Sequence, residues 1–269
     1  MEERDRASKP YILLVENDPL SQEIVKEMLE HCGCRVHVAG TGPEAVDAFS
    51  RQPFDMIFME CQIPGMDGFK TAAIIRSMES ANPGMSVSGR RIPIAALAAS
   101  ALSGGREEVL RSGMDDYLNK PCRISDIQQL LDKWLSSRQT EGGASLSEGE
   151  EKSPAIDREA LNTLAALQPD GAKALLTKLI TVYFDSSSKQ MKSILDAIKG
   201  QDLPSLLTAA HTLKSSSASL GARIFAEQCK DLEMMARSGV IEGAETRAEP
   251  LEREYGRVRE ALDLYLASL

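Results

Sequence analysis

Two kinds of hydrophobic pattern divide the chain. In the first half, short continuous apolar runs alternate with stretches in which apolar residues recur every three or four positions. Such runs predict strands buried on both faces, and the stretches between them predict helices. We therefore expect an α/β doubly wound domain around a parallel five-stranded sheet. Its predicted strands lie at residues 11–15, 35–38, 56–59, 94–99 and 116–118.

In the second half only the helical spacing continues. Short turn signals, such as Gln-Pro-Asp-Gly at residues 168–171, separate long amphipathic stretches. This arrangement predicts an all-α antiparallel four-helix bundle with one short helix before it. The periodic stretches cover residues 156–167, 174–198, 203–220, 224–236 and 251–266.

A polar segment separates the two patterns. Residues 136–155 have the sequence "SSRQTEGGASLSEGEEKSPA", with almost no apolar side chains. Such a segment buries too little surface to offset the entropy lost on ordering, so we expect a flexible linker. The predicted domains are therefore residues 1–135 and 156–269, joined by the linker at 136–155.

Composition excludes several classes of protein. A net charge of −9 and a pI near 5.0 argue against a nucleic-acid partner. We find no apolar run of about 18 residues and no signal peptide, so we expect no membrane insertion. The five cysteines are odd in number and include no Cys-x-x-Cys pair, which favours a reducing, cytoplasmic location. His31, Cys32, Cys34 and His37 fit no familiar zinc spacing, so we expect no metal site there.

The ends of the predicted strands carry the candidate chemistry of the first half, because ligands of doubly wound folds bind there. Around these ends, residues 9–136 resemble the receiver domains of two-component response regulators. The resemblance rests on "ILLVENDP", "MECQIPGMDGF", "PIAALAAS" and "DDYLNKP", in the order of the family. In that family two acids hold magnesium, an aspartate accepts a phosphoryl group, and a Thr or Ser and a Lys bind it.

This chain departs from the family pattern at three positions. Asn17 replaces one magnesium-binding acid, Glu60 stands at the phosphoacceptor, and Ala98 replaces the hydroxyl residue. A glutamate carboxylate is displaced by about 1.5 Å, and a misplacement of about 1 Å can lower a rate about a hundredfold. We therefore expect weak or absent magnesium binding and a receiver that is not phosphorylated. The degenerate site consists of Glu16, Asn17, Glu60, Ala98, Tyr117 and Lys120, of which Tyr117 is the family's aromatic switch residue.

Three interpretations of Glu60 remain open at this point. In the first, Glu60 imitates a phosphorylated aspartate because its longer carboxylate reaches Lys120. In the second, position 60 drifted to another polar residue once the metal site was lost. In the third, Glu60 is an engineered change from aspartate. The further changes at Asn17 and Ala98 favour natural degeneration.

The stretch "AAHTLKSSSASLGA", residues 209–222, carries the chemistry of the second half. His211 is expected beside the apolar stripe of its helix, with its imidazole in water, where a neutral ring nitrogen is a competent nucleophile. Lys214, one turn on, can neutralise added negative charge, and Ser215 leaves room for a partner. The predicted stripe is Leu203, Leu206, Ala210, Leu213, Ser217 and Leu220.

Residues 156–269 resemble histidine phosphotransfer (HPt) domains, whose signature is His-x-x-Lys followed by small residues. The resemblance implies that His211 accepts the phosphoryl group, assisted by Lys214. It also implies a docking surface at Thr208, Ser215 and Ala218, although glycine is usual at position 215.

Together the two halves predict a non-enzymatic phosphorelay intermediate. His211 takes a phosphoryl group from the receiver domain of a hybrid histidine kinase or response regulator, and the pseudo-receiver serves docking or regulation. No glycine-rich ATP-binding segment appears in the helical half, which argues against an autonomous kinase. The alternative is a binding module, in which the pseudo-receiver is an adaptor and the bundle is a phosphoryl sink.

Overall fold

The computed structural model describes residues 9–81, 91–99, 109–135 and 155–268. These residues form two compact units, an α/β unit and a helical unit. The predicted linker at 136–155 lies outside the described residues except for Ala155. None of the helices in the described ranges is long and apolar enough to cross a membrane.

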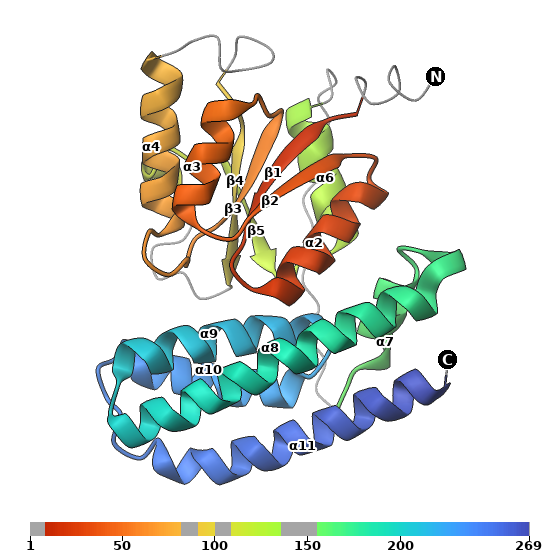
Figure 1. Ribbon diagram of the computed structural model, residues 1–269, viewed down its shortest axis with the longest axis vertical. Helices are drawn as coiled ribbons and strands as arrows, with labels where there is room; N and C mark the ends of the chain where they lie inside the picture. The colour runs from red at the N-terminus through yellow and green to blue at the C-terminus, as the bar shows by residue number, and fades with distance from the viewer. Residues whose placement is uncertain (1–8, 82–90, 100–108, 136–154, 269) are drawn as a thin grey trace. The chain divides into compact units, whose positions relative to one another are not determined.

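The N-terminal unit is built on a five-stranded parallel sheet, as the apolar runs predicted. The strand order is β2-β1-β3-β4-β5, the doubly wound arrangement with β3 at the centre between β1 and β4 (Figure 1). The strands are β1 Tyr11–Val15, β2 Arg35–Ala39, β3 Met56–Glu60, β4 Ile94–Ala99 and β5 Asp116–Lys120. Three of them extend one or two residues beyond their predicted ends.

Helices cover both faces of this sheet. Helices α2 and α6 lie on one side, and α3 and α4 on the other (Figure 1). The bounds are α2 Pro19–His31, α3 Gly42–Arg51, α4 Gly68–Ala81 and α6 Ile124–Leu135. Alternate side chains of β1, such as Leu13 and Val15, join the core cluster that includes Phe49 of α3 and Ile75 of α4. This alternation explains the continuous apolar runs, because both faces of each strand are buried.

The C-terminal unit is a bundle of four long helices preceded by a short one, as predicted (Figure 1). Asp157 and Asp202 cap α7 and α9 by accepting hydrogen bonds from backbone N–H groups of the first turn. The helices are α7 Arg158–Ala165, α8 Ala172–Gly200, α9 Leu203–Ser219, α10 Arg223–Arg237 and α11 Glu245–Ser268, with a 3₁₀ turn at Pro169–Gly171.

Helix α11 begins earlier than the sequence pattern predicted. The expected start was Leu251, directly after Pro250, whereas the helix begins at Glu245 and contains that proline. Proline removes one backbone donor from a helix interior. Ala244 and Leu251 are both buried on either side of it. Packing of these flanking residues favours a helix that continues through the proline.

Candidate functional site

The carboxyl edge of the sheet brings together three of the residues that the sequence singled out. Glu16 follows β1, Glu60 ends β3 and Lys120 ends β5. The ammonium of Lys120 donates to Oε2 of Glu16 and to Oε2 of Glu60, and all three side chains are buried. The second oxygen of Glu60, Oε1, accepts from the backbone N–H of Gln62 at 2.9 Å. The longer carboxylate at position 60 thus reaches Lys120.

These contacts keep Lys120 charged inside the protein. Burial by itself would lower the pKa of Lys120, but the negative charges of Glu16 and Glu60 and the hydrogen bonds to both carboxylates outweigh burial. The pKa of Lys120 is therefore raised well above its usual value. The lysine that the family uses to bind a phosphoryl group is already neutralised by two carboxylates of this chain.

The remaining residues of the predicted receiver site differ in their burial. Ala98 is buried at the end of β4 and brings no hydroxyl, Asn17 is half-buried, and Tyr117 is exposed. Asp18, next to Asn17, is hydrogen-bonded to a residue near it in sequence. Its Oδ2 accepts from the backbone N–H of Ser21 at 3.0 Å and from the Ser21 hydroxyl at 2.8 Å.

Receiver domains of this family bind magnesium at this edge of the sheet, where this chain has two carboxylates, from Glu16 and Glu60, and the amide of Asn17. Magnesium takes near-octahedral oxygen ligands and is usually held by one or two carboxylates. Here Glu16 and Glu60 both accept from the ammonium of Lys120, and position 17 offers a neutral amide. In the described part of the chain, no three or more His, Cys, Asp or Glu side chains are arranged to hold a metal ion. Both carboxylates at this edge are thus bound to Lys120, and position 17 adds no further negative charge.

In the bundle, His211 lies on α9 and contacts an acid from the neighbouring helix. Its Nδ1 is 3.0 Å from Oε1 of Glu233 on α10. Oε2 of Glu233 accepts from Lys214 at 2.6 Å, and Oε1 also accepts from Arg237 at 2.7 Å. The side chain of Glu233 is only 4% exposed. One buried carboxylate therefore binds the histidine and the lysine of the His-x-x-Lys motif.

Glu233 determines which nitrogen of His211 carries a proton. Burial alone would raise the pKa of Glu233, but hydrogen bonds from His211, Lys214 and Arg237 hold that pKa well below its usual value. Glu233 is thus ionised at neutral pH and can only accept hydrogen bonds. Nδ1 of His211 must then be the donor, so in the neutral ring the lone pair is on Nε2.

The expectation that His211 stands out in water is wrong. The residue is 8% exposed, and Ser215, one turn on, is 7% exposed. Thr208 is exposed and Ala218 is half-buried. The predicted position of His211 came from the pattern of α9 alone, which contains no information about Glu233 on α10. The apolar stripe itself is confirmed, since all of its members are buried except Leu203, which is half-buried.

Sequence reasoning missed Glu233 and Arg237. A usable signal was present, because the buried positions of α10 include Ala226, Cys229, Leu232 and Ala236, and Glu233 falls within this apolar stripe. A carboxylate in such a stripe is seldom buried without a charged or hydrogen-bonding partner.

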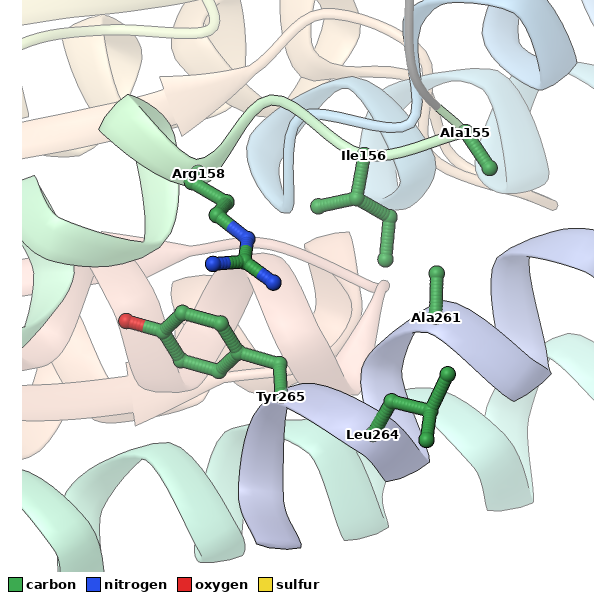
Figure 2. A pocket seen from close by; sticks show the side chains of 6 residues that line it. All are labelled: Ala155, Ile156, Arg158, Ala261, Leu264 and Tyr265. Carbon is green, nitrogen blue, oxygen red and sulfur yellow. The ribbon is translucent and has the colours of Figure 1, made fainter. Parts of the chain in front are cut away.

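A separate pocket of the bundle contains none of the predicted site residues. It lies between the chain entering α7 and the last turns of α11 (Figure 2). Arg158 is its one charged lining residue, and the ring of Tyr265 lies beside it with the hydroxyl donating to Asn162 at 2.9 Å. The lining residues are Ala155, Ile156, Arg158, Ala261, Leu264 and Tyr265.

Comparison with known proteins agrees with this division of the chain. The family model described as "Response regulator receiver domain" matches residues 12–132, and the model described as "Hpt domain" matches residues 178–264. The receiver domain of the sensor histidine kinase PA1611 from Pseudomonas aeruginosa is 39% identical. That match covers 48% of this chain and 100% of the other, with a TM-score of 0.42.

Two curated relatives align with both halves. The sensor histidine kinase GacS of Pseudomonas protegens is 29% identical over 240 residues, which are 88% of this chain and 25% of that protein. The signal transduction histidine-protein kinase BarA of Escherichia coli K12 is 24% identical over 259 residues, which are 94% of this chain and 26% of that protein. The chain thus spans about a quarter of the length of these relatives.

Proposed function

Residues 12–132 are a response regulator receiver domain and residues 178–264 are an Hpt domain, and from this organisation we propose that the chain is a phosphorelay intermediate. His211 accepts a phosphoryl group from an aspartate of a partner's receiver domain and passes it on. The pairing of His211 Nδ1 with the ionised Glu233 supports this assignment most directly, because it leaves the lone pair of the neutral ring on Nε2.

The transfer step follows from this arrangement. The lone pair of Nε2 attacks the phosphorus of the partner's aspartyl phosphate, a P–N bond forms, and the P–O bond breaks with its electrons on the leaving carboxylate. The ring becomes positively charged while its Nδ1 proton stays hydrogen-bonded to Glu233. Onward transfer to a second aspartate reverses these changes, so the step needs no external acid or base.

Lys214 contributes charge to the same site. Its ammonium bonds to Glu233 at 2.6 Å, and a lysine has three N–H donors. It can therefore keep this contact while donating to the phosphoryl group. A phosphorylated side chain carries about −1.5 to −2 charges at pH 7, and the cation at Lys214 offsets part of that charge.

The receiver domain of this chain is proposed to be a pseudo-receiver that serves docking or regulation. Its ammonium at Lys120 is bound by Glu16 and Glu60, and Ala98 offers no hydroxyl. The phosphoryl partners of His211 are then receiver domains of other proteins, a hybrid histidine kinase or a response regulator.

The test is to incubate the full chain with a panel of phosphorylated receiver domains and to assay acid-labile, base-stable phosphohistidine. We expect labelling of the natural chain and none of His211→Gln, which keeps a hydrogen-bond donor but lacks the ring nucleophile. Full labelling of His211→Gln would contradict the proposal. Receiver binding that survives this substitution, with no label on the natural chain, would favour the binding-module alternative.

A further inference from the structure

A run of serines follows His211 on α9, and one of them behaves differently from the others. Ser216 and Ser219 each donate to the backbone carbonyl four residues earlier, both at 3.0 Å. Ser217 bonds to the hydroxyl of Tyr183 on α8 at 3.0 Å. The hydroxyl of Ser215 is buried and has no hydrogen-bond partner among the described residues.

An unpaired buried hydroxyl needs a physical reason. Leaving such a group unsatisfied costs about 1–3 kcal/mol. A serine inside a helix usually avoids this cost by donating to the preceding turn, as Ser216 and Ser219 do. Ser215 lies in the same helix, but its hydroxyl makes no such bond. A hydroxyl in this state is free to bind a group that arrives only during the reaction.

The position of Ser215 on α9 indicates which group that is. Residues four apart on a helix lie one above the other on the same face, so Ser215 is the helical neighbour of His211. Glu233 takes the Nδ1 side of the ring, which leaves the Nε2 side for the phosphoryl group. Lys214 and Ser215, three and four residues after His211, are the cation and the neutral donor of the next helical turn.

We propose that Ser215 is a phosphoryl-binding residue whose hydroxyl donates a hydrogen bond to a non-bridging oxygen of the phosphoryl group on Nε2 of His211. This inference rests on the proposed role of His211. The hydroxyl keeps its proton and forms no covalent bond. The phosphoryl oxygen supplies the acceptor that Ser215 lacks, and a hydrogen bond to a charged acceptor is stronger than one to a neutral acceptor.

A simpler interpretation makes the opposite prediction. HPt domains resembling this one usually have glycine at this position, so Ser215 could merely crowd an approaching receiver domain. Removing its hydroxyl would then speed phosphoryl transfer. If the hydroxyl binds the phosphoryl group, removing it must slow the transfer.

The two interpretations are separated by Ser215→Ala in the full chain, with Ser219→Ala as the matched control. Both variants remove one serine hydroxyl from α9, but Ser219 is already bonded to a carbonyl. With a saturating phosphorylated receiver domain, we expect Ser215→Ala to lower the maximal labelling rate about tenfold or more, the loss of one hydrogen bond to a charged group. The receiver concentration at half-maximal rate should change little, and Ser219→Ala should label like the natural chain.

Two further measurements report on the hydroxyl itself. The phosphorus NMR signal of phosphohistidine should shift in Ser215→Ala but not in Ser219→Ala. The unphosphorylated Ser215→Ala chain should melt at a higher temperature than the natural chain, because an unsatisfied buried hydroxyl is removed.

Equal or faster labelling of Ser215→Ala would overturn the role of Ser215 while leaving the role of His211 intact. Absence of phosphohistidine from the natural chain would instead overturn the proposed function, and the inference with it.

Discussion

Oε1 of Glu233 lies 3.0 Å from Nδ1 of His211, and the other oxygen of the same carboxylate binds Lys214. The two residues of the His-x-x-Lys motif on α9 are thereby joined through one buried acid on α10. Arg237, one turn further along α10, also donates to this acid. The reactive histidine is held by the packing of two helices rather than by its own helix alone.

Replacing Glu233 by glutamine should slow phosphoryl transfer to His211. The amide carries no charge to offset the positive ring, and it no longer obliges Nδ1 to be the donor. We expect the initial labelling rate to fall roughly tenfold to a hundredfold, the range for losing a hydrogen bond to a charged group. Glu227→Gln is the matched control, because Glu227 is an exposed acid of α10 that pairs with Lys230. Similar rates for the two variants would contradict a positioning role for Glu233.

The lowered pKa of Glu233 makes a prediction about acid stability. A carboxyl group whose pKa is lower in the folded state stabilises the fold at pH values above the unfolded pKa, about 4.3 for glutamate. This stabilisation is lost as the pH falls from there through the folded pKa. Between about pH 5 and pH 3, the free energy of unfolding of the natural chain should therefore fall more steeply than that of Glu233→Gln.

Denaturant titrations at several pH values, followed by helical circular dichroism, would measure this difference. The pKa values of Asp116 and Asp202 are also lowered in the fold. Both aspartates are present in both proteins, so the difference between the two curves isolates Glu233. Parallel curves would show that Glu233 does not contribute.

Lys214→Ala should slow labelling of His211 without abolishing it. The ammonium assists by offsetting phosphoryl charge, whereas the nucleophile is Nε2 of His211. We expect a loss of about tenfold, because a charged hydrogen-bond donor is removed. Lys230→Ala is the control, because Lys230 of α10 pairs with Glu227, an exposed acid of that same helix α10. Complete loss of label in Lys214→Ala, with the fold intact, would mean that the lysine does more than offset charge.

Lys120→Met should strongly destabilise the receiver domain. It leaves the buried carboxylates of Glu16 and Glu60 without their shared cation, and breaking a buried ion pair from one side costs about 3–5 kcal/mol. Lys133→Met provides the comparison, because Lys133 is largely exposed and its pair with Asp116 should contribute about 1 kcal/mol or less. Denaturant midpoints measure both changes. Equal midpoints would show that the buried cluster does not stabilise the domain.

Restoring the family's residues should restore a phosphorylatable receiver. We expect Asn17→Asp, Glu60→Asp and Ala98→Thr together to recover labelling by acetyl phosphate in His211→Gln, and each single change to recover little, because such groups act as a unit.

We also expect the natural chain to bind magnesium at the receiver site no tighter than about millimolar, because the site offers one amide and two carboxylates that already bind Lys120. Micromolar magnesium affinity in a calorimetric titration would contradict this expectation.

Local pattern determined most of the fold. The apolar runs located all five strands, because strands buried on both faces require continuous apolar sequence. The stripe on α9 was also correct, since it follows from the helical repeat alone. The strand ends likewise placed Glu16, Glu60 and Lys120 at one edge, because parallel strands end together. These features depend on residues that are near one another in sequence or on rules that hold for every sheet of this kind.

Tertiary structure decided what each candidate residue contacts. The sequence placed His211 in water, but Glu233, 22 residues later on a different helix, pairs with it. It left open whether Glu60 reaches Lys120, 60 residues away, and the sheet brings them into contact. Packing also continued α11 through Pro250. A periodic pattern specifies which face of an element is buried, whereas the partner of a charged side chain depends on which elements pack against that face.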